Sequence, residues 1–253
     1  MDKELACRVF SCIDNTTLNG TDNEAHVEAF CRHTLDLSPL TSHLSPIRVA
    51  AVCVYPRFVS IAKKTLADSG IKVASVAGAF PHGQLPIALK IEEVKYAVGE
   101  GADEIDMVLS RGALLAGEDT LVRDEVALMK EACQGRTLKV ILETGELPSP
   151  TLIAKASQLA IDGGADFIKT STGKIGVGAT LEAAEIMLTV INENVKKGKN
   201  WVGFKAEGGI STPEEALAYA EMAKKIMGDD FVKNQTFRIG ASRLTDRLFA
   251  ILT

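Results

Sequence analysis

Eight short runs rich in β-branched and apolar residues recur along this chain of 253 residues, each followed by a longer stretch. This alternation constrains the fold more than any other feature. Several runs are almost continuously apolar, which is expected of parallel strands that are covered on both faces. The predicted strands are Val9–Asp14, Ile47–Val54, Val73–Ala77, Glu104–Leu109, Leu138–Glu143, Asp166–Thr170, Val202–Lys205 and Phe237–Ile239.

The stretches between these strands carry the periodicity and the start signals of helices. Pro56 and Pro213 suit the first turn of a helix, and Ser211 or Thr212 suits the cap before Pro213. The predicted helices are Pro56–Asp68, Leu85–Gly99, Asp119–Cys133, Pro150–Ile161, Leu181–Val195 and Pro213–Met227, with a last helix from near Ala241. Strand and helix therefore alternate along the chain, as in α/β proteins with a parallel sheet.

Eight βα units with short connections favour a closed (β/α)8 TIM barrel. We expect one domain over residues 1–253, with room for a short extra helix at its N-terminus. The active site of such a barrel lies at the C-terminal ends of the strands. An open, doubly wound sheet is the alternative fold, and the lack of a GxGxxG motif after the first strand disfavours it.

Composition and charge limit the compartment and the partners. The net charge of −5 gives no reason to expect nucleic acid or an anionic membrane as a partner. Five cysteines without a CxxC pair indicate reduced thiols in a cytoplasmic protein. We expect no signal peptide, and no apolar run approaches the roughly 20 residues that span a bilayer.

Charged side chains stand at the ends of four predicted strands, where a barrel places its chemistry. The first strand ends in Asp14, and the fourth carries Asp106. Lys169 and Lys205 stand at matching positions near the ends of the sixth and seventh strands. A lysine among apolar strand residues is costly unless it is used or paired. A salt bridge at the rim is the structural alternative for either lysine alone.

Two lysines at matching positions favour a chemical role, because neighbouring strands lie only about 4.8 Å apart. At roughly 4 Å and an effective dielectric constant near 20, two ammonium groups repel by about 4 kcal/mol. That repulsion is enough to lower the pKa of one lysine toward the neutral range. A neutral amine can attack a carbonyl to form a Schiff base, and Asp106 could relay protons to it.

Glycine-rich turns follow the last three predicted strands and favour a phosphate site. Glycine lets backbone N–H groups approach phosphate oxygens, and barrels often bind phosphate with these loops. The candidate phosphate-binding residues are Thr172, Gly173, Lys174, Gly208, Gly209, Gly240, Ser242 and Arg243. The four histidines, His26, His33, His43 and His82, show no metal-ligand spacing, so we expect no metal and no organic cofactor.

At these residues the chain resembles the deoxyribose-phosphate aldolases, which are class I aldolases. The resemblance runs in order from about residue 8 to the C-terminus, and its most specific parts are FIKTSTGK at 167–174 and the later GFK at 203–205. Further matching segments are Ile13–Asp14, Thr16–Leu18, Ala51–Phe58, Phe80–Gly83, Gly101–Asp106, Lys139–Leu147 and Ile239–Ser242.

The resemblance implies reversible cleavage of 2-deoxy-D-ribose 5-phosphate to acetaldehyde and D-glyceraldehyde 3-phosphate, without a cofactor. It implies that Lys169 forms the Schiff base, that Lys205 lowers the pKa of Lys169, and that Asp106 relays protons. Asp14 would orient Lys205 or the relay, and Cys53 would line the substrate pocket unless it only packs in the core. The partners implied are sugar phosphates and aldehydes, and the expected assembly is a homodimer.

Two departures from the family pattern bear on the phosphate site. The family often has Pro-Ala or Ala-Ser after the second lysine, whereas this chain has Ala206 and Glu207. An acid beside a phosphate loop is unfavourable unless it points away. The family also often has arginine where this chain has Ser211, a charge that Arg243 could restore. Two other functions stay open: a class I aldolase for different aldehydes, and a non-catalytic sugar-phosphate sensor.

Overall fold

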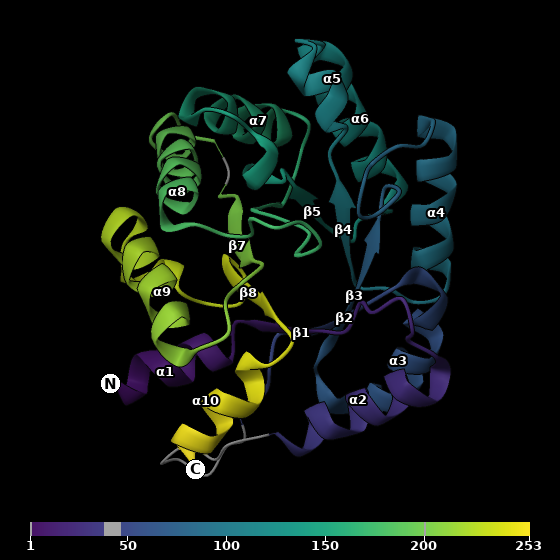
Figure 1. Cartoon of the computed structure of the whole chain (residues 1–253), viewed down its shortest axis with the longest axis vertical. Coiled ribbons are helices and arrows are strands. Elements are labelled where there is room, and N and C mark those ends of the chain that lie inside the picture. The colour runs from purple at the N-terminus through teal and green to yellow at the C-terminus, as the bar shows by residue number, and fades with distance from the viewer. Residues whose placement is uncertain (1, 38–46, 200) are drawn as a thin grey trace.

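The computed structural model describes residues 2–37, 47–199 and 201–253, in which eight parallel strands close into a barrel in chain order, β1 to β8 (Figure 1). The strands are β1 Ile13–Thr16, β2 Ala51–Val54, β3 Lys72–Ala77, β4 Glu104–Val108, β5 Thr137–Ile141, β6 Phe167–Lys169, β7 Gly203–Glu207 and β8 Phe237–Ala241. β1 pairs with both β2 and β8, which closes the barrel. The predicted (β/α)8 barrel is therefore confirmed, and the open sheet is excluded.

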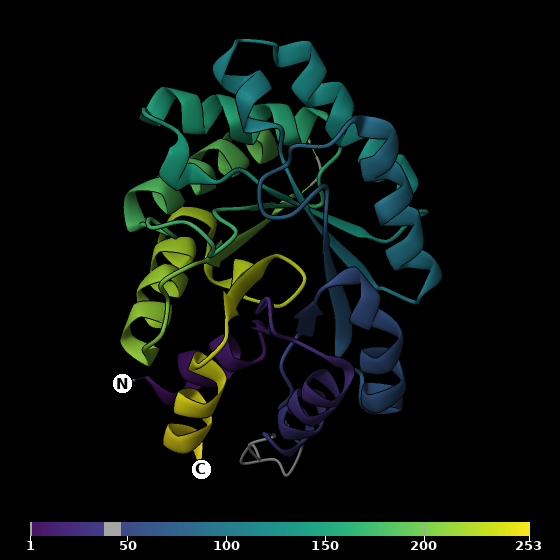
Figure 2. The ribbon, with the colours of Figure 1, turned by 45° about the vertical axis from the view of Figure 1, so that its right-hand side comes forward.

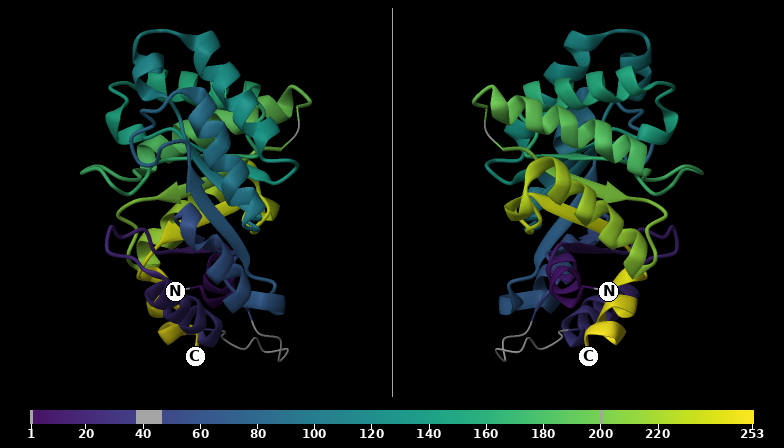
Figure 3. Two further views of the ribbon diagram at one scale, coloured as in Figure 1. Left: turned by 90° about the vertical axis from the view of Figure 1, so that its right-hand side faces the viewer. Right: turned by 90° about the vertical axis from the view of Figure 1, so that its left-hand side faces the viewer.

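Helices surround the barrel (Figure 2). They are α1 Lys3–Phe10, α2 Glu24–Asp36, α3 Val59–Leu66, α4 Ile87–Gly99, α5 Arg111–Leu115, α6 Asp119–Ala132, α7 Pro150–Asp162, α8 Leu181–Lys196, α9 Pro213–Met227 and α10 Leu244–Leu252. The first helix packs against α9 and α10, so the two ends of the chain lie near each other (Figure 3). In the described part of the chain, no helix has both the length and the apolar character needed to cross a bilayer.

Local start signals explain why the later helices begin where the sequence predicts. Helix α9 spans Pro213–Met227, as predicted, and the Thr212 side chain caps it by accepting a hydrogen bond from the Glu215 backbone N–H. The Glu215 carboxylate in turn accepts a hydrogen bond from the Thr212 backbone N–H, which completes a capping box. Helix α7 begins in the same way, with Ser149 as the cap and Pro150 in the first turn.

The predicted first strand, Val9–Asp14, is wrong in its first four residues. Val9 and Phe10 belong to α1, whose start is capped by Asp2, and strand β1 begins only at Ile13. Leu5, Val9 and Phe10 are buried at helical spacing. This apolar stripe attaches α1 to the barrel.

Other boundaries differ from the prediction where turn geometry intervenes. The strand predicted from Ile47 begins at Ala51, and the helix predicted over Pro56–Asp68 is broken into 3-10, α and 3-10 segments. The break after α3 falls at Ala67, whose φ of 38° cannot continue a right-handed helix. Strand β8 runs through to Ala241, and the last helix starts at Leu244. Helices α2 and α5 are not among those predicted.

The main apolar core lies between the sheet and the helices, which accounts for the continuous apolar strands. The inside of the barrel is divided between an apolar part and a charged part. Inside the barrel, a small separate cluster comes mostly from β2 and β3 and contains Leu18, Ala51, Cys53, Ala74 and Val76. The other strands direct buried charged side chains inward, and these residues make the candidate site.

Candidate active site

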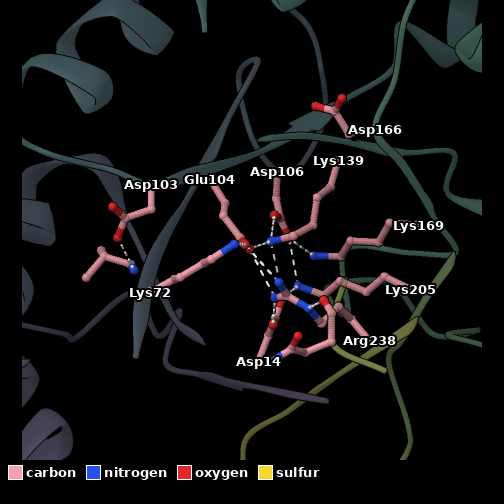
Figure 4. Close-up of polar contacts among 12 residues, drawn as sticks. Asp14, Lys72, Asp103, Glu104, Asp106, Lys139, Asp166, Lys169, Lys205 and Arg238 are labelled. Atoms are coloured by element: carbon pink, nitrogen blue, oxygen red, sulfur yellow. Dashed lines mark hydrogen bonds and ion pairs between the residues drawn. The ribbon is translucent and has the colours of Figure 1, made fainter. Parts of the chain in front are cut away.

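Strand pairing brings the two predicted lysines together. Lys169 on β6 and Lys205 on β7 are direct partners in the parallel ladder. Both side chains are fully buried and point into the barrel, where they meet Asp106 from β4 (Figure 4). Both Nζ atoms donate to one oxygen, Asp106 Oδ2, at 2.9 Å from Lys169 and 2.7 Å from Lys205. The two amines therefore share one small space, as the sequence predicts.

Asp106 is the shared acceptor of this space. Besides the two bonds at Oδ2, its Oδ1 accepts a hydrogen bond of 2.8 Å from Lys139 Nζ on β5. Burial by itself would raise the pKa of Asp106, but the charges of Lys139, Lys169 and Lys205 hold this pKa well below its ordinary value. Asp106 therefore stays ionised. The two lysines are paired with a shared carboxylate, so their mutual repulsion alone does not describe the electrostatics of the site.

Lys205 is a permanent cation in this arrangement. Its Nζ also donates to Asp14 Oδ2 at 2.6 Å and lies 3.2 Å from Glu207 Oε2. Burial would lower the pKa of Lys205, but the carboxylates of Asp106, Asp14 and Glu207 raise it well above its ordinary value. Asp14 thus contacts Lys205 directly, where the resemblance puts it.

Three further charged residues belong to the site and were not among the sequence candidates. Lys139 Nζ lies 2.6 Å from Glu104 Oε2 and 3.2 Å from Asp14 Oδ2. Arg238 on β8 donates to Asp14 Oδ1 at 2.6 Å and holds Glu104 with two bonds of 3.0 and 2.8 Å. All three side chains are buried. A sequence signal was present, because each is a charged residue inside a predicted apolar strand.

Glu207, the residue that departs from the family pattern, points inward from the end of β7. Its Oε2 lies 2.8 Å from Lys169 Nζ, and the residue is only 4% exposed. The carboxylate therefore faces the amines and adds a charge to them. We call the eight residues Asp14, Glu104, Asp106, Lys139, Lys169, Lys205, Glu207 and Arg238 the ionic cluster.

The lowered pKa of Glu104 predicts how the stability of the fold depends on pH. Burial would raise its pKa, but Lys139 and Arg238 lower it from 4.5 to about 2. A lowered folded-state pKa contributes stability that is present above pH 4.5 and is lost as the pH falls through about 2. As the pH falls from 4.5 to about 2, we expect the denaturant concentration at the unfolding midpoint to fall, and to fall less in Glu104→Gln. Denaturant titrations at several pH values measure these midpoints. If the midpoint fell equally steeply with pH in the two proteins, the prediction would be contradicted.

The glycine-rich loops surround a cavity of about 310 Å³ beside the ionic cluster. It is lined by Thr16, Leu18, Asn19, Thr172, Gly173, Lys174, Glu207, Gly208, Gly209, Ile210, Ser211, Gly240, Ala241, Ser242 and Arg243. All eight predicted phosphate-binding residues are thus at one pocket, and the volume suits a small metabolite. Gly173, Gly208 and Gly209 have φ between 71° and 98°, which only glycine adopts easily.

The polar side chains at the pocket differ in their burial and in the hydrogen bonds that they already make. Thr172 is buried, and its hydroxyl donates to Glu143 Oε2 at 2.5 Å. Lys174 Nζ donates to the backbone carbonyl of Leu18, which connects the loops after β6 and β1. Ser242 and Arg243 are exposed at the mouth. Arg243 is therefore placed to meet an anionic group that enters the pocket.

Like Lys169 and Asp106, Cys53 is not among the described residues that line this pocket, so the substrate contact that the resemblance implies for it stays a prediction. It is fully buried in the small apolar cluster inside the barrel. Burial, with a further contribution from Asp106, raises the pKa of its thiol to about 12. Cys53 is therefore a buried, neutral thiol beside the ionic cluster. His43 lies outside the described residues, within which no group of three or more histidine, cysteine or acidic side chains is placed to hold a metal.

Comparison with known proteins agrees with this geometry. The chain is similar to an aldolase named QR15, at 30% sequence identity and a TM-score of 0.79 over 96% of both chains. It is also similar to a Coccidioides immitis protein named as a "putative deoxyribose-phosphate aldolase", at 27% identity and a TM-score of 0.81 over 95% of this chain and 85% of that one.

Deoxyribose phosphate aldolase from Aeropyrum pernix is 24% identical, with a TM-score of 0.72 over 98% of this chain and 90% of that one. This likeness concerns the fold alone. A family model described as DeoC/LacD family aldolase matches residues 8–245. A match over nearly the whole length, on a barrel that holds two paired lysines, shows that this chain belongs to the DeoC/LacD family of aldolases.

Proposed function

We propose that this aldolase acts through a Schiff base on Lys169 and reversibly cleaves 2-deoxy-D-ribose 5-phosphate to acetaldehyde and D-glyceraldehyde 3-phosphate. The observation that carries the proposal is the position of Lys169. Its amine is buried beside a second, charged lysine, and it contacts Glu207, which lines a pocket that also presents glycine loops and Arg243. The first feature supports covalent chemistry at an amine, and the second supports a phosphorylated substrate.

The two lysines take different roles in this proposal. Lys205 donates to both Asp14 and Asp106, so it is held as an ammonium. The Nζ of Lys169 contacts Asp106 and Glu207, and Lys169 is the lysine assigned as nucleophile.

The reaction then proceeds through familiar carbonyl chemistry. The Lys169 amine attacks C1 of the open-chain sugar and forms a carbinolamine. Protonation of its hydroxyl and departure of water give a protonated imine, which draws electrons from the C2–C3 bond. Removal of the C3 hydroxyl proton breaks that bond and releases D-glyceraldehyde 3-phosphate. The remaining enamine takes up a proton at carbon and is hydrolysed to acetaldehyde. By the resemblance, Asp106 relays protons through a water.

Aldehyde release from 2-deoxy-D-ribose 5-phosphate tests the substrate. Acetaldehyde should appear with the wild-type protein and be absent with Lys169→Ala. If other aldehydes turn over and this sugar phosphate does not, a related class I aldolase reaction replaces the proposed one. If no carbonyl compound is trapped on the protein with borohydride, the Schiff-base chemistry itself is wrong.

Arg243 should determine the preference for a phosphorylated sugar. Its guanidinium is exposed at the pocket mouth and can form a charge-assisted bond with a phosphate oxygen. Such a bond contributes on the order of 1.5 kcal/mol or more. We expect Arg243→Ala to raise KM for 2-deoxy-D-ribose 5-phosphate about tenfold, with little change in KM for unphosphorylated deoxyribose. An unchanged ratio of the two KM values would remove Arg243 from the phosphate site.

A further inference from the structure

The ionic cluster contains two carboxylates that touch the Lys169 amine, and they differ in what else they hold. Asp106 Oδ2 accepts from Lys169 and Lys205, and its Oδ1 accepts from Lys139. Both oxygens are therefore committed to ammonium groups. The depressed pKa of Asp106 also makes this carboxylate a weak base.

Glu207 differs from Asp106 in its hydrogen bonding. Its Oε2 forms ion pairs with Lys169 Nζ at 2.8 Å and Lys205 Nζ at 3.2 Å, but this buried oxygen accepts no hydrogen bond from the residues that the structure describes. A buried carboxylate oxygen without a donor is unfavourable and is available to take a proton. The carboxylate oxygen that faces the reactive amine is thus ion-paired but, unlike the oxygens of Asp106, accepts no hydrogen bond.

Glu207 also connects the amine to the pocket. It lines the cavity, whereas Lys169 and Asp106 are not among the described residues that line it. Its Oε1 is turned toward Gly173, because a side chain built at that glycine would meet it at 3.9 Å. Glu207 therefore contacts both the pocket and the Lys169 amine.

The position of this carboxylate is fixed by its backbone. The Glu207 N–H donates to Thr170 Oγ1 at 3.0 Å, and the Thr170 hydroxyl donates back to the Glu207 carbonyl at 3.1 Å. Thr170 is the residue after Lys169, so the acid and the amine are held by adjacent positions. A methyl group at Gly240 would lie 1.9 Å from Glu207 Oε2. Gly240 therefore leaves the space in which the carboxylate lies.

We propose that Glu207 is a further catalytic residue, whose carboxylate carries both protons from the Lys169 nitrogen to the substrate carbonyl oxygen as the imine forms. The proposal rests on the Schiff-base function proposed above. It assigns to Glu207 the steps at nitrogen, for which Asp106 has no free oxygen.

The proton count of imine formation requires two transfers. Glu207 first takes a proton from the Lys169 ammonium, and the resulting amine attacks the carbonyl carbon, forming a C–N bond as the C–O π pair moves to oxygen. Glu207 gives its proton to that oxygen, then takes a second proton from the cationic nitrogen. It delivers this proton to the hydroxyl, which leaves as water while the C=N bond forms. The products are one protonated imine, one water and the carboxylate unchanged.

The rate of borohydride trapping with substrate tests this, because it reports imine formation separately from carbon–carbon cleavage. We expect Glu207→Ala to slow trapping at Lys169 by about 10²- to 10⁴-fold, the usual contribution of general acid–base catalysis. Added formate should restore part of the rate, because it can occupy the vacated space and carry protons. Glu207→Gln is the matched control: its amide fills the space, so formate should have no effect on it.

The outcomes separate this inference from the proposed function. If the wild-type protein traps substrate on Lys169 but Glu207→Ala traps it equally fast or faster, Glu207 is only a counter-ion and the inference is overturned. A slow Glu207→Ala that does not respond to formate overturns it as well. If Glu207→Ala does not fold, Glu207→Asp decides: it keeps the charge but withdraws the carboxylate, and trapping at the wild-type rate would refute the inference. If the wild-type protein traps nothing, the proposed function itself fails.

Discussion

Replacing Lys169 by alanine is expected to abolish borohydride trapping and to lower kcat/KM by at least about 10⁴-fold, the scale seen when a covalent nucleophile is removed. The reason is chemical rather than electrostatic, because no other side chain can form the same imine. Lys205 lies beside it but is held by Asp14 and Asp106. Intact-protein mass spectrometry after reduction with substrate, followed by peptide mapping, measures the effect directly.

A second buried lysine provides the control for this experiment. Lys90 on α4 is fully buried and lies 2.6 Å from Glu125 on α6, a residue outside the ionic cluster. Lys90→Ala should destabilise the protein, but it should still trap substrate on Lys169. If mass is fixed on Lys205 in the Lys169→Ala protein, or if Lys90→Ala also loses trapping, the assignment of Lys169 as nucleophile is wrong.

The part of the site that could be predicted from the sequence is the part that follows from strand periodicity. Lys169 and Lys205 end apolar runs of the same kind, so their meeting requires only that adjacent strands pair in parallel register. The glycine turns after the last three strands could be assigned to one pocket for the same reason. Closed-barrel geometry converts equivalent positions on successive strands into neighbours.

The rest depends on contacts that cross the barrel, which periodicity does not describe. Glu104 meets Arg238 across the interior, 134 residues apart in the chain, and no local pattern links them. From the sequence, Glu207 is an unfavourable acid at a phosphate loop because the predicted strand ends at Lys205, whereas β7 runs on to Glu207 and alternation then puts the side chains of Lys205 and Glu207 on one face. The start of the first strand was misplaced because Val9 and Phe10 are compatible with both a strand and the apolar stripe of α1.

Arg238→Met is expected to lower the free energy of unfolding by about 3–5 kcal/mol, the usual cost of removing one partner from a buried ion pair. Arg238 is 2% exposed and is bonded to Asp14 and to both oxygens of Glu104, each fully buried. Methionine keeps much of the length of the side chain, so the change removes charge more than volume. Denaturant unfolding at neutral pH, followed by circular dichroism, measures the loss.

Two comparisons separate the buried charge from a general effect of losing a salt bridge. Lys155→Met breaks the exposed pair with Asp119, whose side chains are about 40% accessible, and should cost less than about 1 kcal/mol. Adding Glu104→Gln to Arg238→Met should recover part of the stability, because it removes a buried carboxylate that has lost its two hydrogen bonds from Arg238. Were Arg238→Met to cost no more than Lys155→Met, the ionic cluster would not be a stabilising element of the barrel, and its charges would have to be explained by catalysis alone.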